Sequence, residues 1–158
     1  MRKKDKSIAE RETIDSIIHK SQICHLACSL NDQPYVIPIA FGYDGQIVYF
    51  HTARAGKKNE IFHKNPRVCL SFETDISLIM DEENACVWTF DFKSVIATGE
   101  IKEISDLGQK NSGLNQIMLH YSGKDWEMPE REINKTTIWQ VKIETITGKR
   151  SPAETNTE

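Results

Sequence analysis

The segment from Tyr49 to Lys58, YFHTARAGKK, brings a hydroxyl, a glycine and two lysines close together in the chain. It ends a predicted strand and begins a predicted helix, and a helix N-terminus presents free N–H groups and the positive end of the helix dipole. Thr52 supplies the hydroxyl, and Gly56 permits close approach of the backbone. Lys57 and Lys58 supply positive charge. These donors suit a phosphate monoester, although the same residues are compatible with a solvated lysine pair on an exposed helix start.

His51 directly precedes this segment and alternates with Phe50 across the predicted strand. A lone histidine at such a position is commonly a packing residue. Its imidazole can also transfer a proton near neutral pH. The residues themselves leave both interpretations open.

Hydrophobic periodicity predicts a mainly β chain with a few flanking helices. Helices are predicted at 8–20, 56–64 and 106–121, and strands at 23–30, 34–43, 46–51, 67–73, 94–104 and 136–149. Six antiparallel strands with so few helices favour a closed or nearly closed barrel, because closure removes exposed sheet edges. We expect a single domain over residues 1–150 and a disordered polar tail at 151–158.

Local signals indicate how these elements are joined. Ser7 and Glu10 have the spacing of a capping box at the start of the first helix. The Asp-Gly pair at 44–45 predicts a hairpin between the second and third strands. Pro38 favours an edge position or a bulge in the second strand, and Gly99 indicates a bulge or a close backbone approach in the fifth.

Composition argues against two classes of partner. The chain has 158 residues, 27% of them charged, and a net charge of −3, so no overall basic field favours nucleic acid. No apolar run approaches the roughly 20 residues that cross a bilayer. The N-terminal region lacks the apolar stretch of a signal peptide, and we therefore expect a cytoplasmic protein.

The four cysteines are expected to be reduced thiols, because none forms a CxxC pair. A metal site at Cys24, His25 and Cys28 is disfavoured. If this segment is a strand, His25 points to the opposite face from both cysteines. No metal is predicted.

The order PYVIPIAFGYDGQIVYFHTARAGKKNEIFHKNPRVCLSF resembles the FMN-binding split-barrel family, which includes the pyridoxamine 5′-phosphate oxidases and the nitroimidazole-resistance proteins. The resemblance covers about residues 7–104, and the closing ITGK at 146–149 agrees with the nitroimidazole-resistance branch. Its best features are the hairpin leading into YFHTA, the GKK at a fixed distance from Thr52, the NPRV that starts the next strand, and SVIATG downstream.

The resemblance implies roles for particular residues. In the oxidase branch, a Thr and a Ser-Arg-Lys triplet four residues later contact the FMN phosphate, so that Gly56 here replaces the Ser and Lys57 replaces the Arg. The implied cofactor-binding residues are Val36, Ile37, Pro38, Ile39, His51, Thr52, Ala53, Gly56, Lys57, Lys58, Ser94 and Val95. The four residues of the second strand would line the isoalloxazine ring, with Ser94 and Val95 approaching from the fifth. His51 would be the catalytic residue.

The same resemblance implies an FMN-dependent oxidoreductase, a reductase of small nitro or aromatic compounds, with two subunits building each flavin site in a homodimer. Pyridoxamine 5′-phosphate oxidase activity itself is not expected. The chain is short for that branch, and its basic C-terminal signature for the substrate phosphate is not found, because only SPAETNTE follows Lys149-Arg150. Alternatives are a non-catalytic flavin- or haem-binding module, a deazaflavin-using member, and a dimeric protein with an empty pocket. Trp88, Phe90 and Phe92 could cover a flavin face or pack in a core or a dimer.

Overall fold

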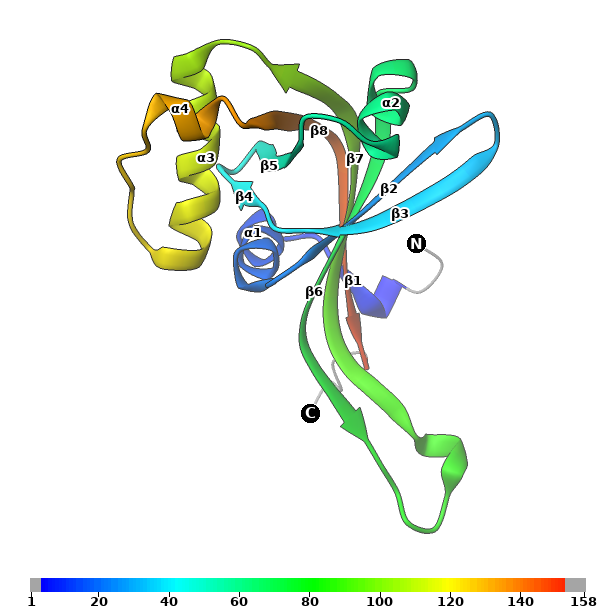
Figure 1. Cartoon of the computed structure of the whole chain (residues 1–158). Helices are drawn as coiled ribbons and strands as arrows, with labels where there is room; N and C mark the ends of the chain where they lie inside the picture. The colour runs from blue at the N-terminus through cyan, green and yellow to red at the C-terminus, as the bar shows by residue number, and fades with distance from the viewer. Residues whose placement is uncertain (1–3, 153–158) are drawn as a thin grey trace.

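An antiparallel sheet of eight strands forms the body of the protein in the computed structural model, which describes residues 4–152 (Figure 1). The strands are β1 (Ser7–Ile8), β2 (Cys24–Leu30), β3 (Gln33–Ile39), β4 (Gly42–Tyr43), β5 (Ile47–Ala53), β6 (Arg67–Ile79), β7 (Thr89–Ile104) and β8 (Thr136–Ser151). The predicted mainly β class is confirmed. The strand count exceeds the expected six because of the two-residue strands β1 and β4.

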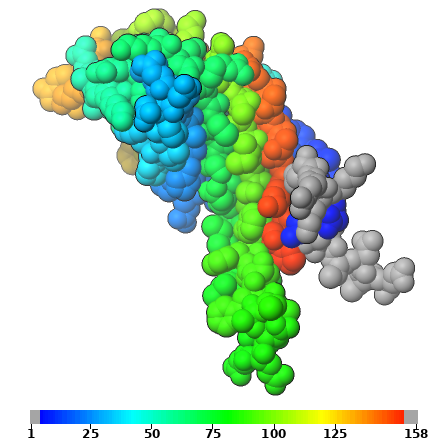
Figure 2. Space-filling view, turned by 90° about the vertical axis from the view of Figure 1, so that its right-hand side faces the viewer, coloured from blue at the N-terminus to red at the C-terminus, as the bar shows by residue number. Residues whose placement is uncertain are grey.

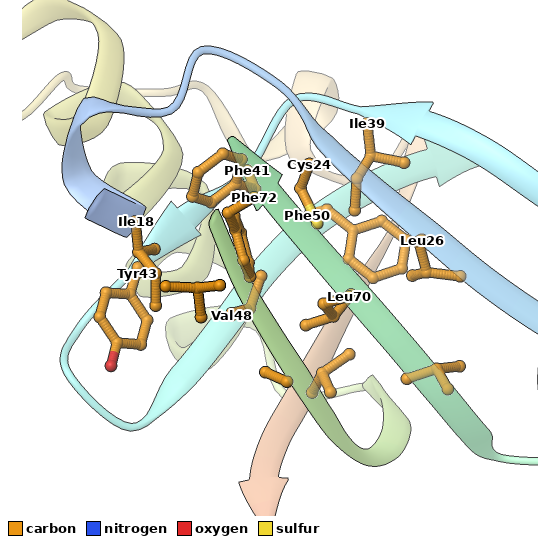
Figure 3. Close-up of a cluster of buried hydrophobic side chains, with 14 of the residues drawn as sticks. Ile18, Cys24, Leu26, Ile39, Phe41, Tyr43, Val48, Phe50, Leu70 and Phe72 are labelled. Carbon is orange, nitrogen blue, oxygen red and sulfur yellow. The ribbon is translucent and has the colours of Figure 1, made fainter. Parts of the chain in front are cut away.

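The strands follow the order β3-β2-β6-β7-β8-β5-β4, with β1 added to β8. The two end strands, β3 and β4, are separated in the chain by residues 40–41 alone, so the sheet curls until its ends meet. Buried side chains fill the inside of the curl, among them Phe50, Leu70 and Phe72, each fully buried (Figure 3). This arrangement is a split barrel with one apolar core.

The helices are α1 (Arg11–Lys20), α2 (Lys57–Lys64), α3 (Leu107–Ser122) and α4 (Glu130–Ile133). α1 contributes the buried side chain of Ile18 to the core, and α3 packs on β4 and β5 (Figures 1 and 3). α2 follows β5 directly and contacts β2. No helix within residues 4–152 combines the length and apolar character that crossing a membrane needs.

The predicted second strand, 34–43, is divided in two. β3 pairs with β2, and only β4 pairs with β5. Between them the chain turns against α3, where the Phe41 N–H donates to the Tyr121 hydroxyl at 3.3 Å. A Cβ on Gly42 would lie 2.2 Å from the backbone carbon of Gln116. This contact with α3 is the physical reason that one continuous strand is not formed.

Three other local predictions, for the hairpin, for Pro38 and for Gly99, agree with the structure. The hairpin at 44–45 is confirmed, although it joins β4 rather than a long strand to β5. Pro38 lies in β3, an edge strand, as predicted. Gly99 marks a register shift between β7 and β8, and a Cβ there would lie 2.1 Å from the Lys142 carbonyl oxygen. Both the bulge and the close approach are therefore present.

The first predicted helix begins later than expected. Ser7 and Ile8 form β1 and pair with the C-terminal part of β8, so the helix begins at Arg11. Glu10 occupies the cap position without a side-chain hydrogen bond. The capping-box prediction is wrong because strand pairing already engages the backbone at Ser7, and because the buried Ile8 anchors that pairing.

β6 and β7 extend beyond their predicted limits, 67–73 and 94–104, into a ribbon that projects from the barrel (Figures 1 and 2). β8 also runs further than predicted, to Ser151, which is buried and pairs with Phe92. The disordered tail expected at 151–158 is therefore wrong at its first residue, and residues 153–158 lie outside the described part of the chain.

Candidate functional site

The end of β5 and the start of α2 form the predicted anion site. Gly56 caps α2 with a φ of 138°, which favours glycine, and no side chain caps the helix. The N–H groups of Asn59 and Glu60 donate to the Gly56 carbonyl at 3.0 and 3.4 Å. The N–H groups of Lys57 and Lys58 have no acceptor within residues 4–152. They are the donors that such a helix start offers to an anion.

Both predicted lysines lie at this helix start, and each lies near another element of the candidate site. The Lys57 Nζ lies 5.0 Å from the centroid of the Tyr35 ring, which places the start of α2 beside β3. Lys58 is half-buried and lies close enough to His51 to affect its ionisation. The structure therefore brings together the cation pair, His51 and β3.

Thr52 has a different role from the one predicted. Its side chain is buried, its hydroxyl donates to the Asn59 Oδ1 at 3.0 Å, and it accepts from the Trp139 Nε1 at 3.0 Å. A hydroxyl has one proton, and here that proton is used inside the protein. The predicted Thr52 contact with a phosphate is not available in this conformation, and Thr52 anchors the site instead.

Asn59 and Trp139 support the candidate site, and the sequence analysis missed both of them. The Asn59 side chain is buried and joins α2 to β5 twice, through Thr52 and through its Nδ2 donating to the Ala53 carbonyl at 2.8 Å. Asn59 lies three residues before the inward-facing Phe62, which is the helical spacing that could have indicated an inward asparagine. The chain of bonds from Trp139 to Ala53 fixes the backbone from which the site is built.

Replacing Asn59 by alanine should lower the free energy of unfolding by about 1–3 kcal/mol, because two hydrogen bonds are lost and the Thr52 hydroxyl loses its acceptor. Urea denaturation measures the change. Glu60→Ala, at the next and exposed position, is the matched control and should be close to neutral. Equal stability of Asn59→Ala and the wild type would show that these bonds do not hold the site.

His51 faces outward from β5 beside the first turn of α2. Part of the ring is exposed, yet desolvation and the positive charge of Lys58 lower the pKa of His51 below its ordinary value of 6.5. The imidazole is thus mainly neutral at pH 7. A neutral ring can orient a ligand through hydrogen bonds and can accept a proton.

The pKa of His51 should rise towards its ordinary value in Lys58→Met, because the repelling charge is removed, and should not move in Lys64→Met at the far end of α2. NMR titration of the imidazole measures both. The unfolded chain binds a proton at the ordinary pKa and the folded chain only at lower pH, so His51 makes stability fall as pH drops below about 6.5. A His51 titration that is the same in all three proteins would contradict the assignment.

The residues predicted on β3 divide between two faces. Val36 and Pro38 face outward and are exposed, whereas Ile39 is buried in the core and Ile37 packs against it. Of these four, only Val36 and Pro38 can offer a side chain to a ligand on the outer face. As an edge strand, β3 also presents backbone groups that no neighbouring strand pairs.

The two residues predicted on β7 do not join this group within one chain. Val95 is fully buried in the core, so its side chain cannot reach a ligand outside the barrel. Ser94 faces outward, but β2 and β6 separate β7 from β3. At an ordinary strand spacing of about 4.8 Å, that is a distance of about 14 Å. The predicted approach of Val95 to a flavin ring is wrong for its side chain.

His25 and the cysteines lie as the strand prediction requires. Cys24 and Cys28 are buried, while His25 faces outward with its Nδ1 3.5 Å from the Glu73 Oε2. The Ser71 hydroxyl donates to the other oxygen of the same carboxylate at 2.5 Å. A shared site for the two thiols and the imidazole is thereby excluded.

Three comparisons place this geometry among known proteins. A sequence model described as pyridoxamine 5′-phosphate oxidase matches residues 10–150. The chain belongs to the pyridoxamine 5′-phosphate oxidase family. An uncharacterized protein of Rhizobium meliloti is 27% identical over 127 residues, which are 80% of this chain and 71% of the relative.

Solved structures agree with this family and with its fold. A putative 5-nitroimidazole antibiotic resistance protein from Bacteroides thetaiotaomicron is 28% identical with a TM-score of 0.81, over 91% of this chain and 86% of that one. A flavocytochrome from Azotobacter vinelandii, 22% identical, has a TM-score of 0.77 over 96% of this chain and 72% of that one. The predicted resemblance to the split-barrel family is confirmed.

Proposed function

We propose that this chain is an FMN-binding oxidoreductase that reduces small nitro or aromatic compounds. The observation that carries the proposal is the uncapped start of α2, where Gly56 opens the backbone and Lys57 and Lys58 add two positive charges. A phosphate monoester satisfies the free N–H groups and neutralises the lysines. The membership of the family and the name of the Bacteroides relative support the same assignment.

The residues fit FMN in distinct roles. Lys57, Lys58 and their backbone N–H groups would hold the phosphate, while Val36 and Pro38 would lie along the ring. When bound, a flavin supplies electron transfer to a substrate. His51, neutral near pH 7, would orient the substrate by hydrogen bonding and exchange a proton with it.

Purified protein loaded with FMN tests the proposal. The flavin is reduced without oxygen by dithionite, a small nitroaromatic compound is added, and the return of the oxidised flavin spectrum and the products are followed. We expect reoxidation to be faster than that of free reduced FMN, with the nitro group reduced by two electrons to a nitroso group for each flavin oxidised, and to slow in His51→Gln while FMN affinity is retained. Reoxidation no faster than that of free flavin would contradict reductase activity.

A homodimer is part of this proposal. In the split-barrel family that the chain resembles, two subunits build each flavin site, and a single copy here leaves Ser94 far from β3. A second copy could bring the outer face of β7 to that strand. Sedimentation equilibrium measures the oligomeric state directly. A protein that is monomeric and still binds FMN tightly would contradict the proposed homodimer.

A second candidate function is a flavin- or haem-binding module without turnover. It is favoured by the names of two structural relatives, the flavocytochrome and a FAD and heme binding protein from Mycobacterium smegmatis, although both share only the fold at this level of identity. The absorption spectrum separates the cases. A flavin spectrum that bleaches on reduction supports FMN, whereas a Soret band would make a histidine a candidate haem ligand.

A further inference from the structure

An open cavity of about 480 Å³ lies where the chain passes from α1 into β2, beside the base of the projecting ribbon (Figure 1). Lys20 and Gln22 line it from the α1 side, and Glu73 and Ile76 line it from β6. His25, the second residue of β2, lines it from the sheet. None of these residues belongs to the anion site at the start of α2, so the cavity is separate from the phosphate end of the proposed flavin site.

The cavity adjoins the strand that is proposed to lie along the flavin ring. In the pairing of β2 with β3, His25 lies directly opposite Pro38. Both side chains point outward, and the Cβ atoms of such a pair are about 4.5–5.5 Å apart. Tyr35, whose ring lies 5.0 Å from the Lys57 Nζ, is three residues before Pro38, or about 10 Å along the strand. A ring that extends from α2 along Val36 and Pro38 therefore ends beside His25.

The carboxylates of the cavity already have partners inside the protein. Glu73 accepts from the Ser71 hydroxyl at 2.5 Å, and its other oxygen lies 3.5 Å from the Nδ1 of His25. Asp75 is paired with Lys93 at 3.1 Å, and the hydrogen bond from Lys93 lowers the pKa of Asp75. A ligand does not need to supply a cation for either acid.

The charge that lacks a partner in the cavity is positive. Lys20 forms no ion pair within residues 4–152, and over the same residues the Nε2 of His25 forms neither an ion pair nor a hydrogen bond. A protonated imidazole donates from both nitrogens, so His25 can bind Glu73 and a ligand at the same time. The cavity therefore favours a ligand that brings hydrogen-bond acceptors.

The wall that carries Lys20 is held in place, because α3 fastens the turn that follows α1. The His120 Nε2 bonds to the Ser21 carbonyl at 2.9 Å, and the Tyr121 hydroxyl donates to the Gln22 carbonyl at 2.7 Å. A wall that is already fixed does not have to be ordered when a ligand binds, which lowers the cost of binding. The cavity is thus preorganised on its α1 side.

We propose that this cavity receives the substrate of the reductase, a flat aromatic compound with a nitro or carboxylate group whose oxygens bind Lys20 and His25. Ile23 and Ile76, which are 43% and 62% exposed, offer apolar surface to the aromatic ring. Glu73 is a positioning residue that orients the His25 imidazole. This inference rests on the proposed FMN-binding function, and it names the substrate class and the residues that recognise it.

Binding without turnover tests the cavity by itself. The purified chain with oxidised FMN and no reductant is titrated with para-nitrobenzoate, which carries both acceptor groups, and the amide NMR signals are followed. We expect shifts centred on residues 20–25 and 73–76. The dissociation constant should rise at least about fivefold in Lys20→Met, because a charge-assisted contact is lost.

Lys64→Met is the matched control for this titration. Lys20 and Lys64 are each the exposed last residue of a helix, but only Lys20 lines the cavity. The control should bind para-nitrobenzoate like the wild type. Shifts centred on other residues, or equal affinities of the wild type and Lys20→Met, would overturn the inference.

Turnover then connects the cavity with the reaction. FMN-loaded protein is reduced with dithionite without oxygen and reoxidised by increasing concentrations of para-nitrobenzoate. His25→Gln should raise the half-saturating concentration at least about fivefold and leave the limiting rate within about twofold, because it removes substrate binding alone. FMN affinity should not change.

His63→Gln is the matched control for His25→Gln. The Nε2 of His63 lies 3.4 Å from Glu103 and its side chain is 58% exposed, against 3.5 Å and 50% for His25. The control should keep the wild-type half-saturating concentration. An unchanged value in His25→Gln would overturn the inference. A wild type that binds the probe at the cavity but is reoxidised no faster than free flavin would instead refute the proposed function.

Discussion

Replacing Lys58 by alanine should weaken FMN binding by about 10- to 100-fold. Lys58 lies half-buried in the first turn of α2, beside free backbone N–H groups, where its ammonium can contact a phosphate oxygen. Loss of one charge-assisted hydrogen bond costs about 1.5–3 kcal/mol, which corresponds to the stated loss of affinity. Quenching of flavin fluorescence on titration measures the dissociation constant. The wild-type affinity should also fall as salt is added.

Lys64→Ala is the matched control for this variant. Lys64 ends the same helix and is exposed, so the charge removed is equal but lies away from the helix start. FMN affinity in Lys64→Ala should stay within about twofold of the wild type, because distant surface charges are screened. Equal affinities of the wild type and Lys58→Ala would mean that the phosphate lies elsewhere.

Replacing Trp139 by alanine should lower the free energy of unfolding by about 3–5 kcal/mol. The indole is 1% exposed, packs edge-on against Phe62 with ring centroids 5.2 Å apart, and donates to the Thr52 hydroxyl. Its loss leaves a large cavity directly beneath the start of α2. FMN affinity should fall as well, because the Thr52 hydroxyl, which donates to Asn59 in α2, loses the indole N–H that holds it in place. Chemical denaturation and FMN titration of the same variant check the two effects.

Trp139→Phe separates packing from hydrogen bonding. It keeps most of the apolar volume and removes the N–H donor, so its loss of stability should be about 1–2 kcal/mol. The exposed Trp126, replaced by alanine, should cost less than about 1 kcal/mol. If Trp139→Ala were no less stable than Trp126→Ala, Trp139 would not be the support of the site that its burial indicates.

Elements with strong local signals were predictable from the sequence. The helix predicted at 106–121 is α3, Leu107–Ser122, because Asp106 caps it by accepting from the Gln109 N–H at 2.8 Å. The helix predicted at 56–64 is α2, and the Asn-Pro pair at 65–66 ends it. In both cases the residues that start or stop the helix lie beside it in the chain.

Long-range pairing decided the elements that were not predicted. Ser7 has the local spacing of a helix cap, yet it pairs with Lys149 at the other end of the chain. The parts of β6 and β7 that form the projecting ribbon, residues 76–79 and 89–92, were not predicted because most of their apolar side chains face solvent in a single copy, which is the reverse of what periodicity assumes. Neither result can be obtained from neighbouring residues alone.

The candidate site also contains residues that local sequence predicts and residues that only long-range contacts reveal. Gly56, Lys57 and Lys58 are contiguous, so their common position at a helix start could be predicted. Trp139 is 87 residues from Thr52, and no local pattern links them. Val95 was assigned to the flavin by resemblance, although the alternation of SVIATG, with Val95 inward between Ser94 and Ile96, gives its true direction.

Competition between FMN, riboflavin and FAD for the wild-type protein tests the phosphate site at the start of α2 most directly. Riboflavin has the same ring without a phosphate, and FAD carries a diester-linked pyrophosphate in place of the terminal monoester. If Lys57, Lys58 and the free N–H groups of α2 bind a phosphate monoester, FMN should bind at least tenfold more tightly than either, and the advantage should shrink with salt. Equal binding of FMN and riboflavin would contradict the site.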